Sequence, residues 1–151
     1  MGGRQTPIAI QQAESISDVL WATDRVFTFD ATAQTITLAD GSAPDDGRMQ
    51  VTSNSTFDVE FASPSARVFV NAGGGNDVLN AASLDSLFAG SVVLNSGSGN
   101  DSISAAGIWV KSLFVGGSGN DNLTGSDLND TIVGGAGDDS ANGLGGDDYI
   151  W

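Results

Sequence analysis

Six aspartates in the second half of the chain share the same neighbours, and they are the residues best suited to chemistry. Each stands at the sixth position of a nine-residue segment that begins with glycine-rich residues. These aspartates are Asp77, Asp101, Asp121, Asp130, Asp139 and Asp148. Carboxylate oxygens bind hard divalent cations, and paired carboxylates can also exchange protons. The chemistry available to them depends on how the segments position them.

The spacing of the segments predicts a coiled chain whose turns stack on two edges. Four contiguous copies fill residues 116–151, and further copies begin at Ala72 and Ser96. Gly116 and Gly134 lie 18 residues apart, so two segments would complete one coil. The two upstream copies begin 24 and 20 residues before the next copy on their edge, which indicates insertions on the opposite edge.

Apolar side chains between the turns predict two ladders that face the interior. Buried parallel strands need apolar residues at the positions that face the core. One edge, which we call the regular edge, consists of the turns at 72–77, 96–101, 116–121 and 134–139. The apolar residues that flank each of these turns are 9 residues apart. One predicted ladder contains Val70, Leu94, Phe114, Ile132 and Ile150, and the other contains Leu79, Ile103, Leu123 and Ala141. Alanine is the smallest of these side chains, so we expect a thinner core at Ala141.

With this pattern, residues 72–151 resemble the RTX (repeats-in-toxin), or haemolysin-type, calcium-binding nonapeptide repeats. Their consensus is G-G-x-G-x-D-x-U-x, where U is a large apolar residue. The resemblance implies an all-β fold, a right-handed parallel β-helix or β-roll in which each nonapeptide supplies a turn and a short strand. It also implies that Ca²⁺ lies between turns stacked on the same edge.

The resemblance further implies which residues hold the metal. On the regular edge, ions would lie between successive members of the series Asp77, Asp101, Asp121 and Asp139. The second edge would hold one ion between Asp130 and Asp148. We therefore expect about four Ca²⁺ ions, each with several oxygen ligands. Glycine carbonyls would complete the ligand sets, from Gly73, Gly75, Gly97, Gly99, Gly117, Gly119, Gly135 and Gly137.

Stacked carboxylates of this kind should resist folding without metal. Adjacent coils lie about 4.8 Å apart, and two like charges at that separation repel by roughly 3 to 4 kcal/mol at an effective dielectric constant near 20. Because the unfolded chain has no preformed cage, the free energy of metal binding becomes free energy of folding. The resemblance implies a secreted or cell-surface protein that folds where calcium is abundant.

Composition excludes several other classes of protein. The chain has 151 residues and neither cysteine nor histidine, which excludes disulfide frameworks, zinc fingers and imidazole or thiolate catalysis. A net charge of -14 argues against nucleic acid as a partner, and no apolar run is long enough for membrane insertion. Residues 71–151 contain 17 of the 21 glycines, so we divide the chain into 1–70 and 71–151.

Residues 1–70 show a weaker pattern of alternating apolar residues. Strands are expected at 26–29, 35–38, 57–61 and 68–70, with a turn-rich stretch at 39–47. These strands would form irregular coils without calcium motifs. A short helix at 15–22 could cover the open end of the solenoid.

Two other functions fit parts of the sequence. Neighbouring acids such as Asp138 and Asp139 could suggest a catalytic carboxylate pair, but the repeat already explains them, and we expect no enzyme activity. A row of asparagines at the fifth position could bind ice in an adhesin; it consists of Asn76, Asn100, Asn120 and Asn129. Asparagine also tolerates left-handed turn geometry, which gives the row a purely structural explanation.

The aromatic residues and the last coil leave the partners of the chain open. We expect Trp21 and Trp109 in the core or a cap, whereas Trp151 could stack on a glycan. The last coil could associate end to end with another chain or with flanking repeats. The whole protein could be a structural or adhesive surface protein, or a secreted enzyme in which these repeats are an accessory or targeting module.

Overall fold

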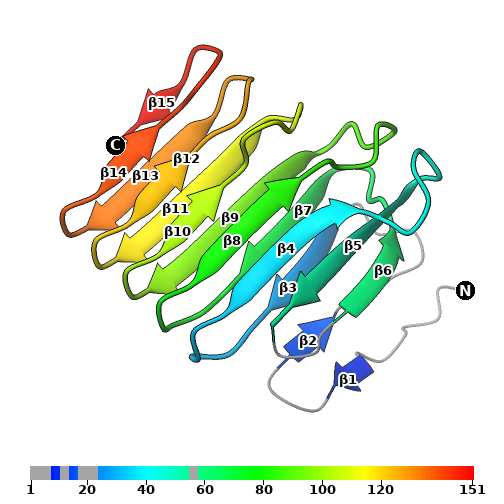
Figure 1. Ribbon diagram of the computed structural model, residues 1–151, viewed down its shortest axis with the longest axis horizontal. Helices are drawn as coiled ribbons and strands as arrows, with labels where there is room; N and C mark the ends of the chain where they lie inside the picture. Colours follow the sequence, from blue (N-terminus) through cyan, green and yellow to red (C-terminus); the bar gives the residue numbers. More distant parts are fainter. Residues whose placement is uncertain (1–7, 11–13, 17–23, 55–57) are drawn as a thin grey trace, which may run out of the picture.

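Two β-sheets make up the described part of the protein (Figure 1). The computed structural model describes residues 8–10, 14–16, 24–54 and 58–151, and within these it contains strands, turns and loops but no helix. In order across the first sheet, the strands are β1 (Ile8–Ile10), β2 (Glu14–Ile16), β3 (Asp24–Thr28), β7 (Arg67–Asn71), β9 (Ser91–Ser98), β11 (Ser112–Ser118), β13 (Thr131–Ala136) and β15 (Tyr149–Ile150). In order across the second, they are β14 (Ser140–Asn142), β12 (Asn122–Thr124), β10 (Ser102–Ser104), β8 (Val78–Ala82), β4 (Thr35–Asp40), β5 (Arg48–Ser53) and β6 (Asp58–Ala62).

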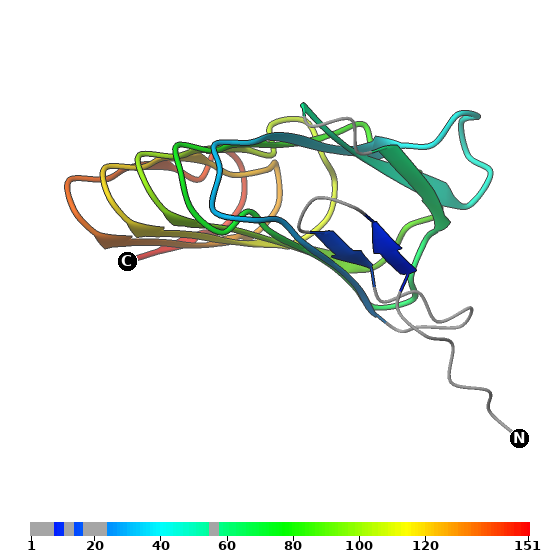
Figure 2. The same ribbon diagram turned by 90° about the horizontal axis from the view of Figure 1, so that it is seen from below.

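From β7 onward the chain alternates between the two sheets and so forms a solenoid. Each strand pairs in parallel with the strand one coil earlier, as in β7 with β9 and β8 with β10. Figure 2 shows the coils as successive loops that join the two sheets. The predicted all-β parallel solenoid is therefore confirmed. The side chains on the inner face of each parallel sheet are buried between the two sheets. Each strand in this half of the chain therefore needs an apolar residue that faces inward.

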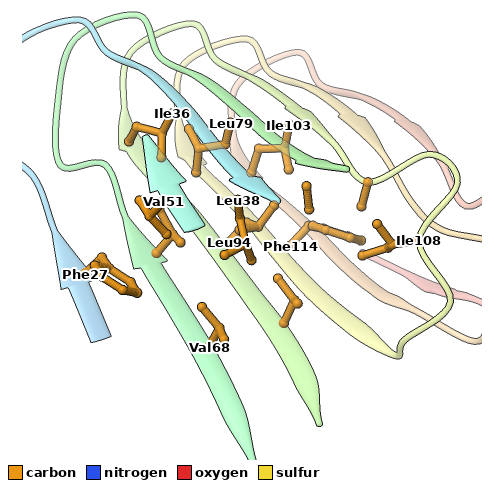
Figure 3. Packing of buried hydrophobic residues seen from close by; sticks show 14 of the residues in the cluster. Phe27, Ile36, Leu38, Val51, Val68, Leu79, Leu94, Ile103, Ile108 and Phe114 are labelled. Atoms are coloured by element: carbon orange, nitrogen blue, oxygen red, sulfur yellow. The ribbon is translucent and has the colours of Figure 1, made fainter. Parts of the chain in front are cut away.

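The register of the sheets confirms both predicted ladders. In the first sheet Val70 pairs with Leu94, Leu94 with Phe114, Phe114 with Ile132 and Ile132 with Ile150. In the second sheet Leu79 pairs with Ile103, Ile103 with Leu123 and Leu123 with Ala141. In Figure 3 the labelled side chains of the two sheets face one another across the core.

The ladders are buried in the middle coils and exposed in the last one. Phe114, Leu123 and Ile132 have 0% of their surface exposed. Ile150 is 49% exposed, and Ala141 is exposed as well. The core thins at Ala141, as expected, because the last coil has another coil on one side only.

At the amino-terminal end, antiparallel strands extend both sheets. β2 pairs antiparallel with β3 and β1 with β2, while β4, β5 and β6 form an antiparallel meander. The expected strands at 26–29, 35–38, 57–61 and 68–70 correspond to β3, β4, β6 and β7, and residue 57 lies outside the described residues. β5 was not expected. Phe27 of β3 and Phe61 of β6 pack with ring centroids 5.0 Å apart, which joins the two sheets here.

The helix expected at 15–22 is wrong at its start. Ser15 and Ile16 belong to β2, where their backbone pairs with Thr28 and Phe27 of β3. Residues 17–22, which include Trp21, lie outside the described residues. Pairing with an available sheet edge overrides a local helical pattern, because edge strands present unpaired backbone groups. Among the described residues, no helix has the length and apolar character needed to cross a membrane.

Two loops interrupt the second edge, as the irregular spacing predicts. They cover residues 83–90 and 105–111 and lie between the regular coils. Within the second loop Ile108 is 1% exposed and Val110 is 9% exposed, so both point inward. Trp109 lies between them and is 71% exposed. The expectation that Trp109 is a core or cap residue is therefore wrong, because inward neighbours on both sides direct its side chain outward.

Candidate metal centre

Glycine-rich turns join the two sheets on the regular edge, and their glycines stack closely. Gly97 has φ +104°, and a Cβ built on it would lie 2.1 Å from the carbonyl oxygen of Gly73 one coil earlier. A side chain at this position would collide with the backbone of the neighbouring turn. All eight glycines expected in the site have positive φ: Gly73, Gly75, Gly97, Gly99, Gly117, Gly119, Gly135 and Gly137. The sequence therefore places glycine where the backbone of adjacent turns must approach.

The aspartates of the regular edge form a column of linked carboxylates. Asp101 Oδ1 accepts the backbone N–H of Asp77 at 2.7 Å, and Asp121 Oδ1 accepts that of Asp101 at 2.9 Å. Asp139 Oδ1 accepts the N–H of Asp121 at 2.9 Å. Each carboxylate thus reaches across the gap to the preceding turn. The structure brings the four predicted aspartates of this edge together on successive turns.

The second carboxylate oxygen of three of these residues lacks a protein partner. Asp77, Asp101 and Asp121 are 1%, 3% and 3% exposed. Among the residues that the structure describes, their buried Oδ2 atoms have no hydrogen-bond partner. An unpaired buried charge is costly unless an ion or a donor compensates for it. These oxygens therefore have the chemistry and the location expected of cation ligands.

Carbonyl oxygens lie close to these carboxylates. At Gly116, a Cβ would lie 2.3 Å from Asp121 Oδ2 and 2.6 Å from the carbonyl oxygen of Gly134 in the next turn. The absence of a side chain on Gly116 leaves room between a carboxylate and a carbonyl. Calcium prefers this combination of oxygen ligands, so the residues fit the metal that the sequence implies.

The second edge repeats the arrangement once. Asp148 Oδ1 accepts the N–H of Asp130 at 3.0 Å. A Cβ on Gly125 would lie 2.7 Å from Asp130 Oδ2 and 2.5 Å from the carbonyl oxygen of Gly143. Unlike the oxygens on the regular edge, Asp130 Oδ2 accepts a backbone N–H, from Ser126. Burial raises the pKa of Asp130.

On this edge, the turn at 125–130 has Ser126 and Leu128 where the repeat consensus has glycine. Ser126 is fully buried, and its Oγ accepts the N–H of Leu128 at 3.2 Å. The hydroxyl thus stabilises a turn in which Ser126 and Leu128 replace two of the three consensus glycines. Asp127 is exposed to solvent.

Burial and mutual repulsion raise the pKa values of two aspartates in the regular column, Asp77 and Asp121. The pKa of Asp77 is raised to about 6, mainly by burial and less by the charges of Asp101 and Asp30, against a hydrogen bond from the N–H of Gln34 that lowers it. Burial also raises the pKa of Asp121, with a smaller contribution from the neighbouring carboxylates. In the absence of metal, the folded state therefore disfavours the ionised forms of Asp77 and Asp121.

The asparagines at the fifth position also link successive turns, but their hydrogen bonds run in the opposite direction. Each asparagine side chain accepts from the following turn, whereas each aspartate side chain accepts from the preceding turn. Asn76 Oδ1 accepts the N–H of Asn100 at 2.9 Å, and Asn100 Oδ1 accepts that of Asn120 at 2.8 Å. Asn120 Oδ1 accepts the N–H of Asp138, and Asn129 Oδ1 that of Asp147. These amide oxygens fasten each turn to the next one, so the row has a structural role. Left-handed turn geometry is not its cause, because none of these four asparagines has positive φ.

One acidic group was missed by sequence reasoning. Carboxylate oxygens of Asp40, Asp46 and Asp85 lie within 4.8 Å of one another outside the repeats. Asp85 is 2% exposed and accepts the N–H groups of Gly47 and Leu87 at 2.8 and 2.7 Å. Its hydrogen bonds tie the loop after β4 to the loop after β8. No regular spacing in the sequence links these three residues.

The fold and the site define a parallel β-solenoid whose glycine turns carry stacked aspartates. A scan against protein families matches the RTX calcium-binding nonapeptide repeat in 4 copies, at residues 67–83, 89–107 and 115–150. The chain belongs to the family with these repeats, and repeats of this family bind Ca²⁺. Comparison with curated proteins and with solved structures finds no match.

Proposed function

We propose that this chain is a structural module that folds when Ca²⁺ binds between its stacked turns. The observation that carries the proposal is the column of buried aspartates, in which Oδ1 is bonded to the preceding turn and Oδ2 has no partner among the described residues. One oxygen of each carboxylate thus positions the turn, and the other is left for a cation.

The proposed ligands are the aspartates and glycine carbonyls of adjacent turns. On the regular edge, Asp101 and Asp121 each serve two gaps, with Asp77 and Asp139 at the two ends. On the second edge, Asp130 and Asp148 serve one gap. The carbonyl oxygens come from the glycines of the same turns. Bound Ca²⁺ supplies the positive charge that the chain lacks there, since Lys111 is the only basic residue after Arg67.

Electrostatics makes folding depend on the metal. Each adjacent pair of carboxylates, at the spacing of coils in a parallel stack, repels by roughly 3 to 4 kcal/mol. Globular domains are stable by only about 5 to 15 kcal/mol, so a few such pairs are enough to unfold a small domain. A cation in each gap converts the repulsion into attraction, and binding stabilises the folded state alone.

The dependence on calcium suits a protein that folds outside the cell. We propose an extracellular location, on the argument that a calcium-dependent fold stays unfolded where calcium is scarce. The exposed apolar residues of the last coil, among them Tyr149, Ile150 and Trp151, support packing of a further coil or a second copy on this end. Either a structural surface protein or an accessory module of a secreted enzyme would use the chain in this way.

Far-ultraviolet circular dichroism with a calcium titration tests the proposal. The protein should lose its strand signal in excess EDTA and regain it with Ca²⁺ but far less with Mg²⁺, which gives up its water ligands reluctantly. A strand signal that is the same with and without metal would refute folding on calcium. Addition of EDTA to the buffer alone provides the baseline.

A further inference from the structure

A turn outside the repeat region stacks against the first repeat turn, one coil earlier along the chain. Residues 29–34 connect β3 to β4, and residues 72–77 connect β7 to β8. Thr28 pairs with Asn71 before the turns, and Thr35 pairs with Val78 after them. The two turns therefore have the same length and the same register on both flanks. Residues 29–34 occupy the position of one further repeat turn at the amino-terminal end of the regular edge.

The backbone of this turn approaches the next one as the repeat turns do. A Cβ on Gly73 would lie 2.6 Å from the carbonyl oxygen of Asp30. The equivalent distance from Gly97 to the Gly73 carbonyl oxygen is 2.1 Å. Asp30 thus places its carbonyl oxygen against the following turn in the way that the second residue of a repeat turn does.

Gln34 occupies the position that aspartate holds in the repeat turns. Its backbone N–H donates to Asp77 Oδ1 at 2.7 Å, which is the bond that Asp77 in turn makes to Asp101. Gln34 is 6% exposed, and its Nε2 donates to Thr32 Oγ1 at 2.8 Å. Among the described residues, its buried Oε1 has no hydrogen-bond partner.

The column of buried oxygens without partners therefore begins one turn before the first aspartate of the regular edge. Its members stand at the same position of four consecutive turns, and they are Gln34 Oε1, Asp77 Oδ2, Asp101 Oδ2 and Asp121 Oδ2. We propose that a further Ca²⁺ binds between turns 29–34 and 72–77, held by Gln34 Oε1, the Asp77 carboxylate and the carbonyl oxygen of Asp30. This inference rests on the proposed function, because it extends the same edge by one gap.

The ligand charges predict how this site differs from the others. The gap has one carboxylate from the stacked position, whereas each repeat gap of this edge has two, and calcium affinity rises with the number of charged ligands. The site at Gln34 is therefore filled last, at the highest calcium concentration. Asp30 Oδ1 accepts hydrogen bonds from the N–H and the Oγ1 hydroxyl of Thr32, and the proposed site takes from Asp30 the backbone carbonyl oxygen that lies against Gly73.

Counting ions in position-34 variants tests the site. The full chain is equilibrated with calcium at several free concentrations, and bound calcium per chain is measured by mass spectrometry of the metal. Gln34→Leu should bind one ion fewer than the wild type. Gln34→Glu should keep the wild-type number and fill the weakest site at a concentration lower by on the order of tenfold, because it adds a charged ligand.

Ser112→Ala is the matched control. Ser112 is the first residue of β11, one coil before Asp130 on the second edge, and its N–H donates to Asp130 Oδ1 at 2.9 Å, as that of Gln34 does to Asp77. Its hydroxyl is satisfied, since Oγ donates to the carbonyl oxygen of Val110 at 3.1 Å. The control should therefore bind as many ions as the wild type.

The outcomes separate this inference from the proposed function. Failure of the wild type to bind calcium overturns both. Calcium-dependent folding with equal ion counts in the wild type and Gln34→Leu overturns only the site at Gln34. A second readout covers a variant that folds poorly: if Gln34 only closes the turn through its amide, Gln34→Glu should be less stable than the wild type in saturating calcium. Greater stability of Gln34→Glu supports the site.

Discussion

Asp121 Oδ1 accepts the backbone N–H of Asp101 at 2.9 Å, across the gap between two coils. The other carboxylate oxygen of Asp121 is buried without a partner among the described residues. In the proposed site one side chain performs two tasks, since Oδ1 fixes the register of adjacent turns and Oδ2 binds the cation. The same division holds for Asp101, whose Oδ1 accepts the N–H of Asp77.

Asp121→Ala should be the most damaging single change of an aspartate. In the proposed site its carboxylate serves two gaps, so we expect two fewer bound ions and a loss of about 3 to 5 kcal/mol of stability in saturating calcium, the scale for breaking a buried charge pair. Urea unfolding in calcium measures the change. Asp127→Ala, at an exposed position five residues before Ile132, is the control and should change little. Equal effects of the two variants would contradict the assignment.

Gly97→Ala should distort the stack of turns. The new Cβ would lie 2.1 Å from the Gly73 carbonyl oxygen, and the residue would have to keep φ near +104°. Gly107 also has positive φ, +88°, but a Cβ on it meets nothing within 4 Å. Gly107→Ala should therefore cost about 1 to 2 kcal/mol from backbone strain alone, and Gly97→Ala clearly more. Thermal unfolding of both variants in calcium measures the difference, and a Gly97→Ala variant as stable as Gly107→Ala would argue against close stacking.

The stability of the metal-free fold should fall as the pH rises. The pKa of Asp77 in the fold is about 6, above its ordinary value of 3.8, so the folded state binds a proton more tightly than the unfolded chain. The stabilising effect of this proton is complete below pH 3.8 and is lost as the pH rises through about 6. Circular dichroism in EDTA across this range tests the direction, because the strand signal that remains without metal should decrease as the pH rises.

Calcium binding should show the opposite dependence. Because protons and calcium compete for the same carboxylates, the calcium concentration needed for folding should be higher at pH 5 than at pH 7. Circular dichroism titrations at the two pH values measure this. A calcium midpoint that is independent of pH would indicate that the buried aspartates are not the ligands.

Leu123→Ala should test the packing between the turns. Leu123 is fully buried in β12, and replacing a buried leucine by alanine costs about 2 to 5 kcal/mol. Leu87 is 65% exposed in the loop at 83–90, so Leu87→Ala should cost far less. Denaturant unfolding in saturating calcium gives both values. Comparable losses would mean that the solenoid core does not pass through Leu123.

The repeat half was predictable because one interval determines both the turns and the core. An interval of 9 between Val70 and Leu79 recurs between Leu94 and Ile103, and it assigns each apolar residue to the correct sheet. The same interval separates Phe27 from Ile36, whose partners one coil later are Val70 and Leu79. This interval alone relates the first coil to the repeats, because the turn at 29–34 contains neither glycine nor the terminal aspartate of the repeat.

The loops and the amino-terminal strands could not be placed by the repeat. Met49 and Val51 of β5 are fully buried, but their neighbours follow no interval that relates them to another coil. Their position depends on long-range pairing with β4 and β6, which sequence alternation does not specify. The outward position of Trp109 had a local signal, because it alternates with Ile108 and Val110.

Anomalous X-ray diffraction from crystals grown in calcium tests the central claim most directly. We predict anomalous peaks along the regular edge, with a cation in contact with Asp101 on each side of its turn and likewise at Asp121. A well-ordered structure that has the same stacked turns but lacks metal density beside these two residues would contradict the account.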